Sequence, residues 1–473
     1  MLPAATIKII GEADTKIVNC QLSTVNFINP FKGSVILDTL ISNVTLVTMN
    51  EKMDVLFGAY LGIADGKIAY IGKTAPEEQP KTIIDGTGMV AIPGLINCHT
   101  HLPTALLRNF LDDSTKTEAL KQLLARQSKI DERAGRAGIK LALAECLRFG
   151  ITSVSDLYYS PEVTAQVAAE VGIKANIALA ATRFVDDSED FDFETDPGCQ
   201  MLVSAAEKWH NYDNGRIKID AGIHAEFTSN HQLWESLSAY AAEQGLGLQL
   251  HLAECAEEVA DCEERTGLTQ AELLNCHGVF RVPVTAVGCA HLTETEQKML
   301  GKAKASAVAL PIAAAKQGYA PTPIGDCVKA GMNVALGTDS AVASGNLDMF
   351  EVMRFAALQT RQAGGDSDVM PAAAPLMMAT VCGARAQGRA DECGMLKEGM
   401  DADIVLVDFS APHLLPCHNV ISSLVFSAKG GDVAMTMVRG KILYQNGQFP
   451  TLNMNEIVSE IMEYAIPKLM EKD

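Results

Sequence analysis

Residues 93–104 read PGLINCHTHLPT and place two histidines, His99 and His101, at the end of an apolar run. If this run is a β-strand, the side chains at i and i+2 project from the same face, about 6–7 Å apart. Two imidazoles placed in that way can bind one divalent metal ion. For an isolated pair, two solvent-exposed loop histidines are the alternative interpretation.

Further candidate ligands and proton carriers stand at the ends of later apolar runs, namely His224, His251, Glu254 and Asp339. Imidazoles combined with a carboxylate suit a borderline-soft ion such as zinc and leave one position for water. A bound ion lowers the pKa of that water toward about 7, which provides hydroxide at neutral pH. Glu254 follows His251 by three residues, where it can pass a proton from the water to a leaving nitrogen. A solvated loop carboxylate is the alternative for Glu254.

The elements that must position these residues are eight short apolar runs separated by helix-patterned segments. The runs are 91–101, 150–159, 173–183, 217–227, 247–254, 284–292, 306–312 and 333–341. Continuous apolar strands that alternate with helices indicate a parallel sheet buried on both faces, and eight such units predict an α/β fold of the (β/α)8 barrel type. Catalytic residues lie at the carboxyl ends of the strands in such a barrel. The candidate residues stand at those ends.

The two ends of the chain have a different sequence pattern from that of the barrel region. Residues 36–92 alternate short β-type runs with DG, GK and GTG turns, and similar runs return at 401–410 and 434–449. We therefore expect one small β-sandwich domain built from both termini. The predicted boundaries are 1–91 and 393–473 for the two parts of this domain and 92–392 for the barrel.

Composition limits the partners. The chain of 473 residues carries a formal net charge of −20, which argues against binding to nucleic acid or to anionic membranes. The first twenty residues lack the pattern of a secretory signal, and no apolar run reaches the roughly 18–20 residues that span a bilayer. The twelve cysteines are scattered without a CxxC pair, as expected for free thiols in a reducing cytoplasm. A cytoplasmic protein is expected.

Several longer segments resemble the amidohydrolase superfamily, closest to its branch of S-adenosylhomocysteine and methylthioadenosine deaminases and chlorohydrolases. The segments are PGLINCHTHLPTALLRNFLDD, GIHAEF, HLAECAEE, GTDSAVASGNLDMFEVMR, MATVCGARAQG and LKEGMDADIVLVD. The resemblance covers roughly residues 38–460 and implies a (β/α)8 barrel with a small β-sandwich. It also implies a small-molecule substrate and, by analogy at the level of the fold, a homo-oligomer. Residues 1–37 would then be an extension that the family lacks.

The resemblance assigns roles to individual residues. The resemblance implies one divalent metal ion, zinc, with iron or manganese as alternatives. Its implied ligands are His99, His101, His251 and Asp339. Glu254 is implied as the proton carrier and substrate contact, and His224 as a second substrate contact. Arg183 matches an arginine that holds the substrate carboxylate in the adenosylhomocysteine enzymes.

The chain departs from the family at four places. Gly288 stands where a histidine on the sixth strand usually orients the hydroxide, while His291 follows three residues later. The usual His-Asn-Pro after the seventh strand is Ala-Leu-Pro at 309–311. Ala119 replaces an aromatic residue, and Gln200 lies near the expected second arginine.

These departures affect the expected substrate more than the fold. A deaminase of a purine-like or other heterocyclic molecule is the leading hypothesis. The alternatives are hydrolysis of another leaving group, such as a cyclic amide or ring halide, and a catalytically impaired metal-binding or ligand-binding protein.

Overall fold

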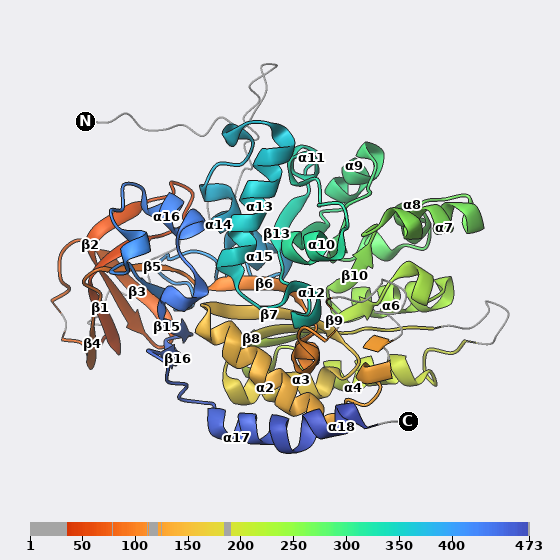
Figure 1. Ribbon diagram of the computed structural model, residues 1–473, viewed down its shortest axis with the longest axis horizontal. Coiled ribbons are helices and arrows are strands. Elements are labelled where there is room, and N and C mark those ends of the chain that lie inside the picture. Colours follow the sequence, from red (N-terminus) through yellow and green to blue (C-terminus); the bar gives the residue numbers. More distant parts are fainter. Residues whose placement is uncertain are drawn as a thin grey trace.

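The computed structural model describes residues 36–77, 79–110, 112, 122–123, 125–183 and 191–471. All eight strands expected for the barrel are present, pair in parallel and follow one another in sequence order (Figure 1). They are β6 (Leu95–Thr100), β7 (Ile151–Tyr158), β8 (Lys174–Leu179), β9 (Ile217–Ile223), β10 (Leu248–Leu252), β11 (Val284–Gly288), β12 (Ser306–Ala309) and β13 (Asn333–Leu336). Just beyond β13, the Asp339 N–H donates to the His99 carbonyl at 3.0 Å, which brings the end of the barrel sheet back to β6.

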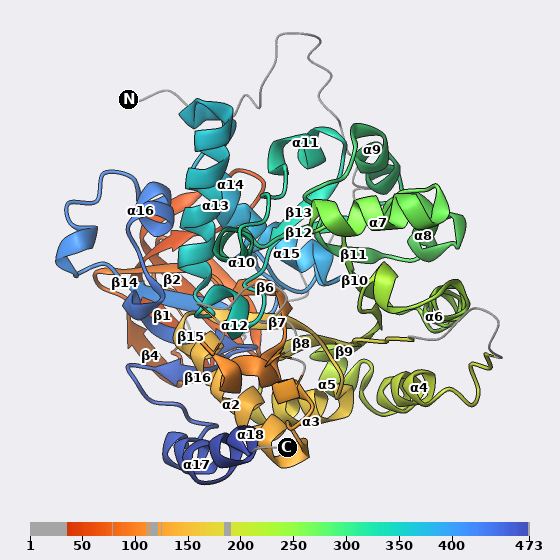
Figure 2. The same cartoon turned by 45° about the vertical axis from the view of Figure 1, so that its right-hand side comes forward.

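Helices follow the strands around the outside of the barrel (Figures 1 and 2). The main ones are α2 (Glu132–Arg148), α3 (Pro161–Val171), α4 (Pro197–Trp209), α6 (His231–Gln244), α7 (Ala256–Thr266), α8 (Gln270–Cys276), α9 (Glu294–Lys302), α10 (Pro311–Gln317), α11 (Ile324–Lys329), α13 (Met349–Gly364), α14 (Ala373–Met378) and α15 (Val381–Ala386). Helices thus form between the barrel strands, as the sequence pattern predicted. Asn230 begins α6 by accepting from the Leu233 N–H at 3.2 Å, and Gly245 ends it in the left-handed conformation.

Strands from both ends of the chain form the second sheet, as the sequence predicted. Its members are β1 (Thr39–Val47), β2 (Val55–Ala64), β3 (Lys67–Gly72), β4 (Thr82–Asp85), β5 (Met89–Pro93), β14 (Ile404–Asp408), β15 (Val433–Val438) and β16 (Lys441–Gln445). They follow the order β16-β15-β14-β5-β1-β2-β3, and β4 pairs with β1. Beyond β3 the sheet meets the segment that leads into β14, because Ile68 N–H donates to the Met400 carbonyl at 2.8 Å. The sheet therefore folds around its own apolar core, which includes Ile41, Leu61 and Met437.

The chain ends in two helices, α17 (Met454–Glu460) and α18 (Ile466–Met470), which run below α2 in Figure 1. An ion pair of 2.7 Å between Arg133 of α2 and Glu460 of α17 joins them. Among the described residues, none of the helices has the length and hydrophobicity that a membrane span requires. The eleven cysteines within this part of the chain are all free thiols. The predicted extension, residues 1–37, falls almost entirely outside the described residues.

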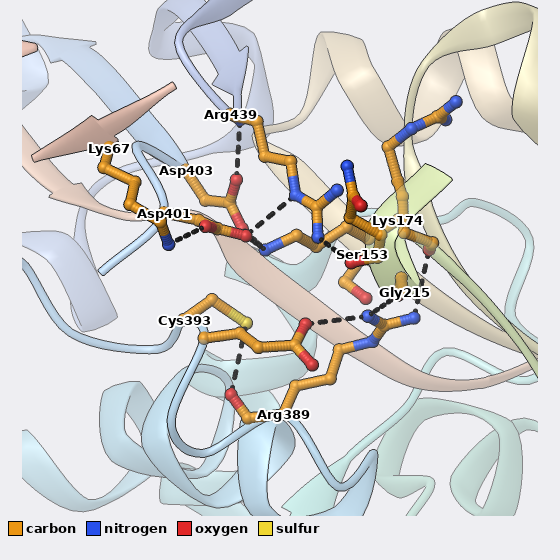
Figure 3. A network of polar contacts seen from close by, with 12 residues as sticks. Lys67, Ser153, Lys174, Gly215, Arg389, Cys393, Asp401, Asp403 and Arg439 are labelled. Atoms are coloured by element: carbon orange, nitrogen blue, oxygen red, sulfur yellow. Dashed lines mark hydrogen bonds and ion pairs between the residues drawn. The ribbon is translucent and has the colours of Figure 1, made fainter. Parts of the chain in front are cut away.

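A buried polar network joins the terminal sheet to the barrel at the amino end of β8 (Figure 3). The Lys174 ammonium lies 2.8 Å from Asp401 and 2.6 Å from Asp403, and its side chain has no exposed surface. Asp401 also contacts Lys67 and Arg439, each at 2.8 Å. We call these five residues the Lys174 network. It lies at the opposite end of the barrel from the candidate ligands.

Candidate active site

Three imidazoles converge at the carboxyl end of the barrel. The Nε2 atom of His99 lies 3.2 Å from that of His101 and 3.1 Å from that of His251. His99 is completely buried on β6, and the other two histidines are partly buried. The i, i+2 spacing on β6 and the register of β10 therefore bring together the side chains that the sequence singled out.

Hydrogen bonds to Nδ1 of two of the rings determine which ring nitrogen is unprotonated. The Nδ1 of His101 lies 2.6 Å from the Leu157 carbonyl, and the Nδ1 of His251 lies 2.7 Å from the His224 carbonyl. A carbonyl oxygen only accepts, so each Nδ1 must carry the proton. The Nε2 lone pairs of both neutral rings then face the same point, as in protein sites where backbone carbonyls orient metal-binding histidines.

Burial keeps these imidazoles neutral. Loss of solvent lowers the pKa of His101 and of His251 to about 4, and it lowers the pKa of His99 well below its usual range. The neutral form is the one that binds a metal ion. At physiological pH the three rings are therefore ready to act as ligands.

Asp339 adds a carboxylate to this group. Its Oδ1 lies 3.4 Å from the Nε2 of His101 and 3.9 Å from that of His99. The residue has a φ of +64°, a left-handed conformation that aspartate tolerates better than most side chains. The Ser340 N–H donates to the same Oδ1 at 2.5 Å, which fixes the carboxylate. Strained backbone of this kind is concentrated at functional sites.

The donor set fits a zinc ion. Zinc–nitrogen bonds of about 2.0–2.1 Å in a tetrahedron separate the ligand atoms by about 3.3 Å, close to the separations of 3.1 and 3.2 Å between the Nε2 atoms. Without a cation, converging lone pairs repel one another. Three neutral imidazoles and one carboxylate are also the ligand types that zinc prefers.

Two residues that hold the ligand-bearing segments in place were not predicted from the sequence. Buried Asn97 donates to the Thr338 hydroxyl at 2.7 Å and accepts from the Thr338 N–H at 3.0 Å, which ties β6 to the segment that carries Asp339. Buried Asp156 accepts from the Leu102 N–H at 2.7 Å and so fixes the chain directly after His101. A signal for Asn97 existed, because it precedes His99 by two residues and shares its face.

Glu254 and Asp339 line one pocket beside the histidines. The other lining residues come mostly from the segment after β12 and include Leu310, Tyr319 and Thr322. Burial, followed by the charges of Asp339 and Glu258, raises the pKa of the Glu254 carboxyl well above its usual range. A carboxyl group with a raised pKa thus stands at the edge of a small cavity next to the candidate metal ligands.

Gly288 also lines this pocket, and its backbone excludes a side chain. Its φ is +92°, and a Cβ added there would stand 2.2 Å from Cγ of Glu254. The side chain of Glu254 therefore occupies the space where an imidazole would begin. The expected histidine is missing at a place that cannot accommodate one while Glu254 keeps its position.

His291, which follows Gly288 by three residues, lies beyond the end of the strand. β11 ends at Gly288, and the His291 N–H donates to the Ala253 carbonyl at 3.0 Å in the following turn. Strand alternation does not apply to His291.

His224 and Arg183 lie on the same face of the barrel. The His224 ring packs against His251 with centroids 5.2 Å apart, and burial lowers its pKa to about 3. Its Nδ1 lies 3.2 Å from the Thr228 hydroxyl. The backbone N–H of Arg183 donates to the Thr228 carbonyl at 2.8 Å, so Thr228 lies between the two residues.

The Arg183 guanidinium has partners within the chain. It lies 3.5 Å from Asp196 and 5.0 Å from the centroid of the Phe191 ring. The Gln200 side chain donates to the Phe193 carbonyl at 3.1 Å. Ala119, another of the four departures noted in the sequence, lies outside the described residues.

Comparisons with known proteins agree with this geometry. A model of the amidohydrolase family matches residues 90–443. A 5-methylthioadenosine/S-adenosylhomocysteine deaminase from Moorella thermoacetica is 35% identical over 426 residues, covering 89% of this chain and 97% of the relative. A 5'-deoxyadenosine deaminase from Methanosarcina mazei is 33% identical over 429 residues, covering 90% and 98%.

A solved structure is similar in the same way. The crystal structure of an adenosine deaminase from Xanthomonas campestris with bound zinc has a TM-score of 0.86 and 28% sequence identity to this chain. The match covers 91% of this chain and 98% of the other. The similarity therefore extends over both the barrel and the terminal sheet.

Proposed function

The chain belongs to the amidohydrolase family and is a metal-dependent hydrolase, and on that premise we propose that it is an aminohydrolase of a purine-like heterocycle. Water and the ring amine would give a ring carbonyl and ammonia. The observation that carries the proposal is the convergence of three imidazole Nε2 atoms beside two carboxyl groups, Asp339 and Glu254, that share one pocket. The deaminase names of similar proteins support the choice of reaction.

One metal ion, which we propose to be zinc, belongs to this site. The residues proposed to hold it are His99, His101, His251 and Asp339. When bound, the ion supplies an activated water molecule. Backbone carbonyls hold the Nδ1 sides of the His101 and His251 rings, and the Ser340 N–H donates to Oδ1 of Asp339.

The other polar residues act on the substrate. Glu254 takes up a proton and delivers it to the amino nitrogen, so that the C–N bond breaks with neutral ammonia as the leaving group. His224, a neutral imidazole, contacts the heterocycle. The backbone N–H of Arg183 donates to the Thr228 carbonyl beside His224, and we propose that Arg183 lies toward the substituent of the ring.

A second candidate is a metal-binding protein with little turnover. Gly288 favours it, because glycine offers no group to orient the attacking water. The pocket beside Gly288 also lies next to both carboxyl groups, so a substrate atom has room to approach them there. The measurement of product separates the two candidates.

The test is ammonia release by the full chain after loading with zinc. The panel contains methylthioadenosine, adenosylhomocysteine, 5'-deoxyadenosine, guanine and a triazine, and zinc content is measured in parallel. We expect release from at least one nucleoside. Zinc at one ion per chain without ammonia from any compound would contradict the aminohydrolase and favour the second candidate.

Matched variants assign the roles. Glu254→Gln is expected to keep zinc and to lose about 10²–10⁴-fold in rate, whereas Glu257→Gln, on the exposed neighbour, stays close to the parent. His251→Ala is expected to lose zinc. His224→Ala should retain zinc, because the hydrogen bond that orients His251 comes from the backbone carbonyl of residue 224, which the substitution keeps. Unchanged zinc content in His251→Ala would remove that residue from the ligand set.

A further inference from the structure

Arg183 is the cationic side chain that follows β8 at the carboxyl end of the barrel. Thr228 lies between the backbone of Arg183 and the ring of His224. The Thr228 carbonyl accepts from the Arg183 N–H, and the Thr228 hydroxyl lies 3.2 Å from the Nδ1 of His224. The His224 ring in turn packs against His251. A substituent that extends from a heterocycle held at His224 therefore passes close to Arg183.

An aspartate of the same chain already neutralises this arginine. The Asp196 carboxylate lies 3.5 Å from the guanidinium, and the two side chains are only 19% and 14% exposed. Because both groups are largely removed from water, their charges are poorly screened and compensate each other. The Phe191 ring contributes a further contact on the guanidinium at 5.0 Å.

A second interaction, at the start of a helix, holds the Asp196 side chain in place. It is the N-cap of α4, and its Oδ1 accepts from the Cys199 N–H at 3.0 Å. Rotation of the carboxylate away from Arg183 would break this cap, which typically contributes about 1 kcal/mol to stability. A competing anion would have to displace a carboxylate that the fold has fixed.

Other charges and amides nearby do not favour an anion. Asp192 and Glu194 precede Asp196 on the same segment and add negative charge. The Gln200 amide donates to the Phe193 carbonyl within the chain. Like charges at a binding site discriminate against an anionic ligand.

Resting on the proposed aminohydrolase function, we propose that the substrate is a nucleoside whose 5' substituent carries no carboxylate, and that Asp196 sets this preference by occupying Arg183. Of the compounds that the similar proteins are named for, methylthioadenosine and 5'-deoxyadenosine have this chemistry, and adenosylhomocysteine lacks it. Asp196 is thus a specificity-determining residue.

The experiment compares methylthioadenosine with adenosylhomocysteine, because the two share the nucleoside and the thioether and differ in the amino-acid arm. Both kcat/KM and the calorimetric Kd are measured with the zinc-loaded full chain and with Asp196→Asn. Asparagine keeps a good N-cap while it removes the charge. We expect the parent to favour methylthioadenosine by at least tenfold. Asp196→Asn should improve adenosylhomocysteine by about tenfold and leave methylthioadenosine within twofold.

Two controls isolate the contact. Asp192→Asn removes one negative charge from the same segment without touching the contact between Asp196 and Arg183, and it should leave the selectivity unchanged. The double variant Arg183→Gln/Asp196→Asn should lose the gain for adenosylhomocysteine. A gain that persists in the double variant would show that Arg183 does not receive the carboxylate, and it would overturn the inference.

The outcomes separate this inference from the function on which it rests. Equal use of the two nucleosides by the parent, or an unchanged ratio in Asp196→Asn, overturns the inference while ammonia release upholds the aminohydrolase. Binding of methylthioadenosine in preference to adenosylhomocysteine without ammonia release contradicts the aminohydrolase and supports the selectivity. If neither nucleoside binds, both statements are wrong.

Discussion

The backbone at Gly288 decides which residue can stand there. Its left-handed φ of +92° is unfavourable for any side chain, and an added Cβ would approach Glu254 to 2.2 Å. Gly331 provides a matched comparison, because its φ is +90° and no atom lies within 4 Å of the position of an added Cβ. The two glycines share the conformational cost of a substitution and differ in the collision.

We predict that Gly288→Ala lowers the free energy of unfolding more than Gly331→Ala. The left-handed conformation costs about 1–2 kcal/mol at either position, and the contact with Glu254 adds about 1–3 kcal/mol at Gly288 alone. Urea unfolding of both variants measures the difference. Gly288→His is expected to release ammonia no faster than the parent. Equal losses of stability in the two alanine variants would show that Glu254 moves aside without cost.

At this scale the sequence predicted which histidines converge better than it predicted their surroundings. His99, His101 and His251 were recognisable because they interrupt apolar runs at equivalent places. The collision that a side chain at residue 288 would make with Glu254 could not be recognised from the sequence. It depends on a backbone angle and on the register of two strands. The partner of Arg183 was missed for a similar reason, since a loop brings Asp196 back to it.

Helix α13 is joined to the terminal part of the chain by one buried carboxylate. Asp348 accepts from the Phe350 N–H at the start of α13 and from the Gly430 N–H, both at 2.8 Å. Burial raises its pKa to about 6, although both hydrogen bonds act in the opposite direction. An unfolded aspartate has a pKa of about 3.9. The folded protein therefore binds a proton at Asp348 at a pH where the unfolded chain does not.

We predict that Asp348 destabilises the fold as pH rises. Because its folded pKa exceeds the unfolded value, its contribution to stability is greatest below about pH 4 and is lost as pH rises through about 6. Asp348→Asn should therefore reduce the fall in the free energy of unfolding between pH 5 and pH 7 by about 1 kcal/mol. The quantity compared is the change in the free energy of unfolding between the two pH values. Its absolute value is not compared, because asparagine cannot accept from both the Phe350 and the Gly430 N–H and therefore lowers stability at every pH.

Urea unfolding at the two pH values provides the measurement. Asp366→Asn is the control, because Asp366 also caps a helical turn through the Asp368 N–H but is exposed. It should leave the pH dependence as in the parent. A parent-like slope in Asp348→Asn would show that this carboxyl does not take up the proton.

The elements themselves were largely predictable. Eight apolar runs predicted eight barrel strands because parallel strands buried on both faces need continuous hydrophobic sequence. Strands at both chain ends were equally clear from their alternation. The contact between the terminal sheet and Met400 was not predictable, because it depends on a loop without a regular hydrophobic period.

Over the whole molecule, the Lys174 network fastens the terminal sheet to the barrel (Figure 3). Lys174 and Asp401 are 227 residues apart in sequence and are both largely buried. Burial opposes ionisation of Asp401, but the charge of Lys174 and its hydrogen bond outweigh this and hold the pKa of Asp401 well below its usual range. The sequence offered no sign of this joint, since Lys174 is one polar residue at the start of an apolar run.

We predict that Lys174→Met lowers the free energy of unfolding by about 3–5 kcal/mol, because it leaves Asp401 and Asp403 buried without their central cation. Lys67→Met removes a partner of the same Asp401, but Lys67 is 50% exposed. That variant should lose about 1 kcal/mol or less. Urea unfolding compares the two. Zinc content should stay unchanged in both, since the proposed ligands lie at the other end of the barrel. Equal losses in the two variants would contradict the special role of Lys174.

The order in which the ribosome makes the chain gives the terminal sheet a further significance. Strand β5 is hydrogen-bonded to β14, yet roughly 300 residues of barrel are synthesised between them. At about 5–20 residues per second, this edge of β5 waits on the order of 15–60 s for its partner. During that interval the nascent chain carries an open strand edge, which is a template for pairing with other chains. This sheet can therefore be completed only after the whole barrel has been synthesised, and the growing polypeptide exposes the edge of β5 until then.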